Sequence, residues 1–354
     1  MSACAWMRGW LLALLLAPGL LLAGQARAGD ACPALAQRQA DPVVAVRVAA
    51  VACAEHLRWN RPFIDEHGRL ASLVAYEAES NGLQDGSAPW RRVAFYWQSS
   101  GLLAAMAFSA GASDCGYAAL SLSYPGLGCR AFVVDNPWSA AFISWVMQRA
   151  GVPAFRSSAS HFDYVRAARL DPAGSPYRFV APESAPIEQG DLLCYVRAGL
   201  VHGTEGLARL LDGRGGGLPM HCDVIVATEA GRAYAVGGNV QQAVTMRLLD
   251  LNAQGHLWGL PRRLAGDTAC SPDAADACNF NRQDWAVLLK LKPQEELARL
   301  GPVEPPAALP NPPVAPETPT CCVQCVLGAD VPRCPVSGPP PATPPETVPL
   351  QGAG

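Results

Sequence analysis

Asn136 to Gly151 reads N-P-W-S-A-A-F-I-S-W-V-M-Q-R-A-G, a stretch that predicts one buried helix. Its apolar residues recur at helical spacing. Pro137 suits the first turn of a helix, and Gly151 is a typical residue at which a helix ends. A helix that is apolar around most of its circumference belongs in a core. We therefore expect the rest of the fold to pack around this segment.

Ser139 lies at the start of this predicted helix, and two interpretations of it remain open. Serine is a preferred helix N-cap residue, which would make its role structural. Free backbone N–H groups and the positive end of the helix dipole also gather there, which suits a nucleophile or the relic of one. The second interpretation requires a histidine from a sheet packed against the helix.

The first 28 residues resemble a secretory signal peptide. Arg8 precedes an apolar run from Trp10 to Ala23, and Ala26-Arg27-Ala28 forms a small-x-small cleavage site. The run is too short for a typical membrane anchor, and no later stretch is long and apolar enough to span a bilayer. We expect cleavage after Ala28 and a periplasmic or secreted protein.

Charge argues against a nucleic-acid partner. The chain carries 27 basic and 30 acidic residues, and the first 28 residues contain two arginines and no acids. Cleavage would therefore leave 25 basic residues against 30 acidic ones, a formal charge of −5. Nucleic-acid binding normally needs a basic surface, so we expect no nucleic-acid partner. The oligomeric state cannot be predicted from the sequence.

The cysteines favour disulfides over a metal. Thirteen are present, and removal of Cys4 with the signal would leave twelve. An even number in an exported protein is typical of disulfide bonding. The six histidines are scattered and no H-E-x-x-H motif occurs, so we expect neither a metal site nor a cofactor. Short separations suggest the pairs Cys115 with Cys129 and Cys270 with Cys278, and Cys32 with Cys53 is a further candidate pair. Cys194 and Cys222 are interpreted as free buried thiols.

The N-terminal half predicts helices and the second half predicts strands. Helical patterns cover residues 41–57 and 90–98, a loop covers 115–129, and a short helix opens near His161. The glycine-rich segment 203–217 lacks the lysine of a phosphate-binding loop, and we interpret it as a mobile surface loop. Short apolar runs joined by turn residues predict an antiparallel sheet from 190–196, 221–227 and 233–240, extended by 244–248 and 285–291.

Composition changes abruptly after Leu300. Prolines crowd the segment from Pro302 to Pro349, and apolar periodicity disappears. Such a segment cannot bury enough apolar surface to form a core. We expect a signal peptide at 1–28, one domain at 29–300 and a disordered tail at 301–354. The tail contains Cys321, Cys322, Cys325 and Cys334, for which disulfides or cross-links fit an oxidising compartment better than zinc.

Three residues in chain order form a candidate catalytic constellation. Ser139 starts a helix, His221 starts a strand, and Asn239 ends the next strand. An antiparallel pair would place His221 beside Asn239, giving a nucleophile, a base and a group that orients the base. Asp223 shares a strand face with His221 and is an alternative orienting group. His161 and Trp138 are further candidates for orienting or substrate contact, and structural roles remain open for all of them.

The motifs W-S-A-A-F-I-S-W-V-M, G-D-L-L-C-Y, H-C-D-V-I-V and G-G-N-V carry a family resemblance. Their order resembles the papain-like cell-wall hydrolases of the NlpC and CHAP types. As a set they resemble more closely the bacterial family known as domain of unknown function 2272, over roughly Val43 to Leu291. The resemblance implies a papain-like α+β fold, with helices followed by an antiparallel sheet. Ser139 stands where such hydrolases carry a cysteine.

Three functional hypotheses follow. The first is an exported hydrolase of amide or peptide bonds in the cell envelope, acting on peptidoglycan or an envelope peptide through Ser139, His221 and Asn239. Serine would then need a true general base, because its hydroxyl is far less acidic than a thiol. The second is a non-catalytic module that binds or supports the cell wall. The third is an accessory protein whose tail binds a partner.

Overall fold

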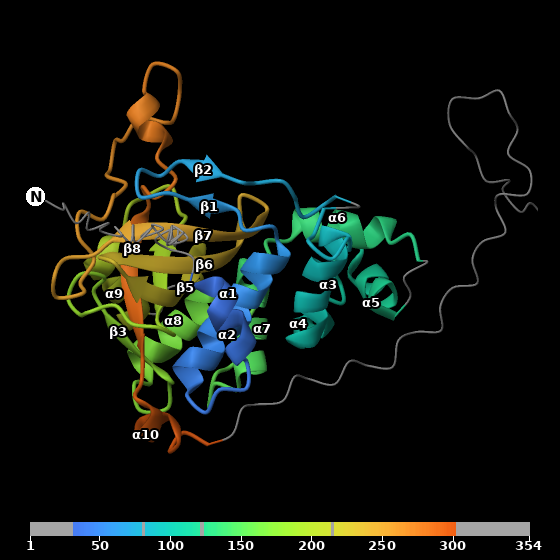
Figure 1. Ribbon diagram of the computed structural model, residues 1–354, viewed down its shortest axis with the longest axis horizontal. Helices are drawn as coiled ribbons and strands as arrows, with labels where there is room; N and C mark the ends of the chain where they lie inside the picture. The colour runs from blue at the N-terminus through green and yellow to red at the C-terminus, as the bar shows by residue number, and fades with distance from the viewer. Residues whose placement is uncertain (1–30, 80–81, 121–123, 214–215, 302–354) are drawn as a thin grey trace, which may run out of the picture. The chain divides into compact units, whose positions relative to one another are not determined.

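The computed structural model describes residues 31–79, 82–120, 124–213 and 216–301, which form a mixed α+β fold (Figure 1). Its sheet has eight strands in the order β2-β1-β7-β6-β5-β4-β8-β3. All neighbouring strands are antiparallel except β1 and β7. The strands are β1 Phe63–Ile64, β2 Leu70–Ala71, β3 Tyr177–Val180, β4 Leu192–Val196, β5 Met220–Glu229, β6 Arg232–Val240, β7 Ala243–Asp250 and β8 Asp284–Leu291.

The helices lie mainly before the sheet in the sequence, as predicted. The predicted helices at 41–57, 90–98 and His161 correspond to α2, α3 and α8. The observed α-helices are α1 Cys32–Leu35, α2 Val44–Arg58, α3 Pro89–Ser99, α4 Leu102–Ala105, α5 Ala112–Leu120, α6 Leu127–Asp135, α7 Ser139–Ala150, α8 His161–Leu170, α9 Gly203–Asp212 and α10 Gln294–Leu297.

Helix α7 is the central helix that the sequence predicts. It contacts α2 and α3 as well as strands β5 and β6. Phe142, Ile143 and Val146 are fully buried, and burying a side chain of this size contributes about 1.5–3 kcal/mol relative to leaving it exposed. The helix ends at Gly151, whose positive φ of 67° is a backbone conformation that glycine adopts without a Cβ penalty.

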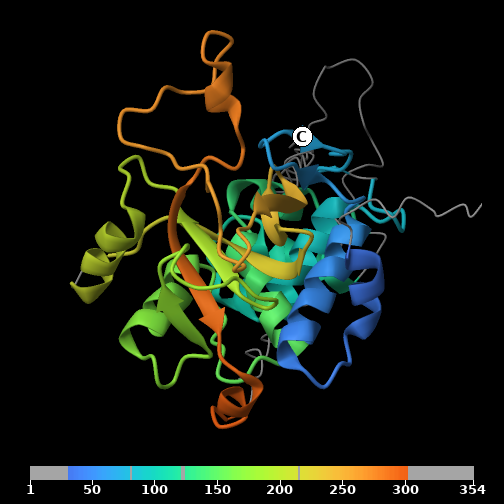
Figure 2. The ribbon, with the colours of Figure 1, turned by 60° about the vertical axis from the view of Figure 1, so that its left-hand side comes forward.

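The sheet separates two apolar clusters. Alternate residues of β5, including Cys222 and Val224, join the large cluster that contains α7. Ile225, one position on, joins a second cluster with Tyr195 and Trp285 on the opposite face. This period-2 alternation assigns His221 and Asp223 to the second face. Figure 2 shows the long connection between β7 and β8 in orange, extending away from the sheet.

Four disulfides link the eight cysteines of the described chain. The predicted pairs Cys32–Cys53, Cys115–Cys129 and Cys270–Cys278 are all present. The interpretation of Cys194 and Cys222 as free thiols is wrong, because they form a fourth disulfide. These two residues lie directly opposite each other on β4 and β5. Their pairing depends on strand register, which cysteine spacing alone does not reveal.

Two predicted loops contain helices. The segment expected to be a mobile glycine-rich loop includes α9, whose Leu207 and Leu211 are buried and anchor it. The segment 115–129 belongs partly to α5 and α6, which its disulfide joins. None of the helices in the described chain has the length and apolar character needed to cross a bilayer. The predicted signal peptide at 1–28 lies outside the described residues, as does the predicted tail at 301–354 apart from Gly301.

Candidate functional site

Ser139 is the first residue of α7, and its hydroxyl contacts a histidine. Trp138 occupies the N-cap position, and no side-chain capping bond is formed there, so the interpretation of Ser139 as an N-cap is wrong. The Ser139 Oγ atom lies 2.7 Å from Nε2 of His161. Ser139 and His161 are each 3% exposed. A hydroxyl and an imidazole at this distance can exchange a proton directly.

His161 connects Ser139 to Tyr164. Both His161 and Tyr164 belong to the first turn of α8, three residues apart, where side chains lie on one helix face. The Tyr164 hydroxyl is hydrogen-bonded to Nδ1 of His161. Burial lowers the pKa of His161 well below its usual value, and the neighbouring His221 lowers it further. The His161 imidazole is therefore neutral at pH 7 and can accept a proton from Ser139.

His221 and Asp223 form a second polar pair near the start of β5. Nε2 of His221 lies 2.8 Å from Oδ1 of Asp223, and both side chains are completely buried. Burial lowers the pKa of His221 to about 4, against the opposing effect of Asp223. The carboxylate can only accept, so Nε2 carries the proton and Nδ1 has a free lone pair. Nδ1 is buried without a hydrogen-bond partner in the described chain.

Arg247 of β7 holds Asp223 from its other side. Nε of Arg247 lies 3.0 Å from Oδ2 of Asp223. Arg247 also donates to the carbonyl oxygen of Phe280 at 2.5 Å and to the Tyr195 hydroxyl at 3.3 Å. Burial raises the pKa of Asp223, but His221 and Arg247 outweigh it, so the net pKa lies below the usual value. Asp223 is therefore an ionised carboxylate between two donors.

Gly237 of β6 leaves the space that Asp223 and His221 occupy. A Cβ atom at this position would lie 1.8 Å from Oδ1 of Asp223 and 2.9 Å from Nε2 of His221. Neither separation is possible between real atoms without movement. Gly237 is thus a packing requirement of the polar pair, and it lies where the end of the strand becomes irregular.

Asn239 lies away from the His221–Asp223 pair. The β5–β6 ladder begins at Val224↔Val236, and β6 is irregular between Gly237 and Val240. Asn239 has a positive φ of 55°. In the amide orientation that satisfies its neighbours, its oxygen accepts from the Trp138 backbone N–H at 3.2 Å, and its nitrogen donates to Glu77 at 3.3 Å. Asn239 therefore supports the start of α7.

Trp138 is positioned by the same buried acid. Its indole Nε1 donates to Oε2 of Glu77 at 2.6 Å. The indole is fully buried and stacks against Trp59 with ring centroids 5.6 Å apart. Burial raises the pKa of Glu77, and the Trp138 hydrogen bond lowers it by less. Trp138 thus anchors the helix start on which Ser139 stands.

The structure brings together four of the residues singled out from the sequence. Ser139 contacts His161, His221 contacts Asp223, and the ring centroids of the two histidines are 5.3 Å apart. Among the described residues, the hydrogen-bond partner of the Ser139 hydroxyl is His161, whereas Asp223 occupies the position beside His221 that was predicted for Asn239. The arrangement places a hydroxyl, two neutral imidazoles and an ionised carboxylate close together. These groups can donate and accept protons.

Sequence reasoning missed Tyr164, Arg247 and Glu77. The spacing of Tyr164 three residues after His161 on a predicted helix was a usable signal for their contact. Arg247 and Glu77 carried no such signal, because they reach the site from a distant strand and from a segment without regular structure. Across the described residues, no group of three or more His, Cys, Asp or Glu side chains is arranged to hold a metal ion.

Comparison with protein families identifies the chain. The family described as an uncharacterized protein conserved in bacteria (DUF2272) matches residues 84–291. The match spans more than half of the 354 residues and includes Ser139, His161, His221 and Asp223. The protein belongs to this family. Neither a search of curated proteins nor a search of solved structures finds a match.

Proposed function

We propose that this protein is an exported hydrolase that cleaves amide or peptide bonds of the bacterial cell envelope, with Ser139 as its nucleophile. We also propose that its fold is a papain-like variant of the NlpC or CHAP type, with serine in place of cysteine. The single observation that carries the proposal is the 2.7 Å hydrogen bond between Ser139 Oγ and His161 Nε2 at the start of α7. Four disulfides support an oxidising, extracytoplasmic compartment.

His161 is the base that this geometry favours. In the proposed reaction, Oγ of Ser139 attacks the carbonyl carbon of the scissile amide, and its proton passes to Nε2 of His161. The imidazolium then returns the proton to the leaving nitrogen as the C–N bond breaks. Water hydrolyses the resulting ester on Ser139 and regenerates the hydroxyl. Tyr164 orients His161 by accepting a hydrogen bond from Nδ1 in this tautomer.

The start of α7 supplies donors for the negative charge that develops on the carbonyl oxygen. The first N–H groups of a helix have no partner within that helix. We propose that the backbone N–H groups of Ser139 and Ala140 form the oxyanion hole. Loss of one such donor typically reduces kcat by a factor of about 10² to 10³.

His221, the residue predicted from the sequence to be the base, is the second candidate base. Its free Nδ1 lone pair and its ionised partner Asp223 favour this role. Asp223 would stabilise an imidazolium at His221, whereas His161 has only the hydroxyl of Tyr164 beside Nδ1. In the structure the Ser139 hydroxyl is hydrogen-bonded to His161, and His221 lies beside His161 with the two ring centroids 5.3 Å apart.

A fluorophosphonate probe tests the proposal directly. We expect covalent labelling of the purified protein at Ser139, complete loss of labelling in Ser139→Ala, and retention in Ser144→Ala. Ser144 is a matched control because it belongs to the same helix, and within the described part of the chain its hydroxyl bonds to the backbone of Ser158. Absence of labelling, combined with inactivity toward peptidoglycan and small esters and amides, would reject the hydrolase.

Burial of the site favours one alternative, a non-catalytic module that binds the cell wall. Ser139 and His161 are almost inaccessible, and His221 and Asp223 are wholly so. In that case the polar groups stabilise the fold, and a separate surface binds the envelope. Sedimentation with purified cell wall, unchanged in Ser139→Ala and His221→Ala and without release of soluble fragments, would support this alternative.

A further inference from the structure

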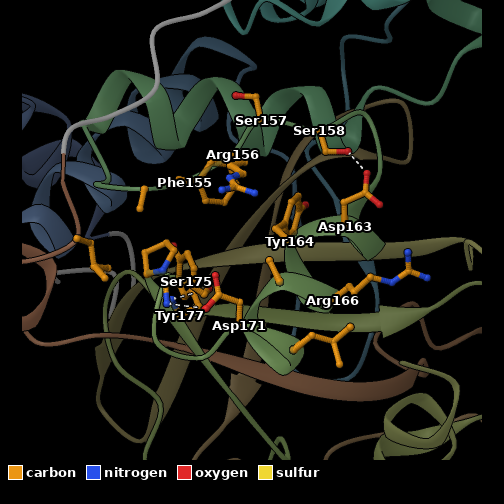
Figure 3. Close-up of a pocket in the computed structure, with 16 residues that line it drawn as sticks. Phe155, Arg156, Ser157, Ser158, Asp163, Tyr164, Arg166, Asp171, Ser175 and Tyr177 are labelled. Carbon is orange, nitrogen blue, oxygen red and sulfur yellow. Dashed lines mark hydrogen bonds between the residues drawn. The ribbon is translucent and has the colours of Figure 1, made fainter. Parts of the chain in front are cut away.

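A pocket of about 820 Å³ lies beside α8, within the size range of small-molecule sites. Its walls come from residues 154–158, from α8, from residues 174–177 and from Leu300. Figure 3 shows Arg156, Tyr164 and Asp171 among the side chains that line the pocket. The pocket shares Tyr164 with the site described above, whereas Ser139, His161 and His221 do not line it.

Arg156 is the polar group of this pocket that is most available to a ligand. It is exposed, and within the described chain its guanidinium has no hydrogen bond or ion pair. The two acids are already engaged, since Asp163 accepts a hydrogen bond from Ser158 at 2.6 Å and Asp171 accepts one from the backbone N–H of Gly174 at 2.9 Å. A planar guanidinium with open donors matches a carboxylate, which it can bind through two parallel hydrogen bonds.

The pocket also presents apolar surface. Leu170 is 55% exposed and lines it together with the partly buried Leu300. Covering exposed apolar area stabilises a complex in proportion to the area removed from water. A ligand that offers a carboxylate to Arg156 and an alkyl group to the leucine side chains would satisfy both features.

Tyr164 connects this pocket with Ser139. Its side chain lines the pocket, while its hydroxyl is hydrogen-bonded to Nδ1 of His161. Nε2 of the same ring lies 2.7 Å from Ser139. A ligand that moves Tyr164 alters the partner of Nδ1, and the tautomer of a neutral imidazole depends on the partners of its two nitrogens.

We infer that this pocket binds a small ligand with one carboxylate and an apolar side chain, and that binding acts on Ser139 through Tyr164 and His161. The binding itself is independent of the proposed hydrolase activity. Only the consequence for Ser139 reactivity rests on the proposed function. Ligand binding and the proposed hydrolase activity can therefore be disproved separately.

Binding is tested with N-acetyl-leucine and N-acetyl-leucinamide, which differ only in whether the carboxylate is present. Titration followed by ligand-observed NMR should show binding of the acid and at least tenfold weaker binding of the amide. Arg156→Ala should weaken binding of the acid at least tenfold, whereas Arg69→Ala, an exposed arginine of the β1–β2 connection, should leave it unchanged. Equal affinity for acid and amide, or equal affinity in Arg156→Ala, would overturn the inferred site.

Coupling is tested by following the His161 imidazole nitrogens by NMR, with the signals assigned from His161→Gln. N-acetyl-leucine should shift these signals in the wild type. In Tyr164→Phe, which keeps the ring but removes the hydroxyl, the ligand should still bind without the same shift. Unchanged His161 signals in the saturated wild type would overturn the coupling. This readout requires no turnover, so it holds whether or not the protein is a hydrolase.

Discussion

Ser139 and His161 are the first residues of consecutive helices, and their hydrogen bond of 2.7 Å joins the two helix starts. The connection between α7 and α8 therefore brings together two side chains that are 22 residues apart in sequence. Because both belong to helix starts supported by packing, their relative position is fixed by the fold. His221 reaches the same region from β5, with Asp223 fixing its other nitrogen.

The two histidines should contribute unequally to the reactivity of Ser139. We expect His161→Gln to slow fluorophosphonate labelling by a factor of about 10² to 10⁴, the usual contribution of a general base. His221→Gln should slow it by less, because the hydroxyl does not bond to His221 in the resting structure. Stopped-flow or gel-based labelling rates of the folded variants provide the measurement. The reverse order of effects would assign the base to His221.

The depressed pKa of His221 predicts acid sensitivity. Its pKa of about 4 in the folded protein compares with about 6.5 for an unperturbed histidine. The unfolded chain therefore binds a proton between these values while the folded protein does not, so stability falls as the pH is lowered from about 6.5 toward 4. The difference of about 2.5 pKa units corresponds to roughly 3 kcal/mol.

Comparison with His221→Gln isolates this contribution. Between pH 7 and pH 4, the free energy of unfolding of the wild type should fall by about 3 kcal/mol more than that of the variant. Asp191, whose pKa burial raises to about 6, acts in the opposite direction but is present in both proteins. Urea unfolding at the two pH values measures the difference. Parallel losses in the two proteins would show that His221 is not buried and neutral.

The sequence was sufficient for the elements whose pattern is local. Apolar spacing and Gly151 defined α7, and turn residues between short apolar runs defined the hairpins of β5, β6 and β7. The short strands β1 and β2 were missed, because two-residue strands carry no alternation. Helix α9 was not predicted, because the glycine-rich composition of the segment indicated a loop. The helical spacing of Leu207 and Leu211, which are buried, was overlooked.

Four residues of the candidate site were predictable from the sequence, but their contacts were only partly predictable. Ser139, His161, His221 and Asp223 were all singled out, and the shared face of His221 and Asp223 followed from strand alternation. The sequence did not predict that Ser139 bonds to His161, because this contact depends on the path of the connection between α7 and α8. The position of Asn239 did not follow either, because the irregular end of β6 turns its side chain toward Glu77.

The disulfide between β4 and β5 should contribute measurably to stability. Cys194 and Cys222 are 28 residues apart, and a crosslink of this span typically contributes about 2–4 kcal/mol. The double variant Cys194→Ala/Cys222→Ala should lose stability in that range in chemical unfolding. Cys270→Ala/Cys278→Ala, with a separation of 8 residues, should lose about 1 kcal/mol less, because loop entropy grows with the logarithm of length. An unchanged midpoint in the first variant would contradict the prediction.

Gly237 should be required by the pair of His221 and Asp223. In Gly237→Ala the new methyl group would meet Oδ1 of Asp223 at 1.8 Å, so the carboxylate must move away from its two donors. We expect a loss of about 1–3 kcal/mol in the free energy of unfolding, the usual effect of overpacking a filled interior.

The matched control for that substitution is Gly199→Ala, where no atom lies within 4 Å of the added methyl group. Thermal unfolding should show the loss in Gly237→Ala alone, and the His221 imidazole nitrogens should shift only in that variant. Equal stability of the two variants, with unshifted His221 signals, would mean that β6 can move aside. Asp223 would then not depend on the missing side chain at position 237, and the G-G-N sequence would serve only the irregular end of the strand.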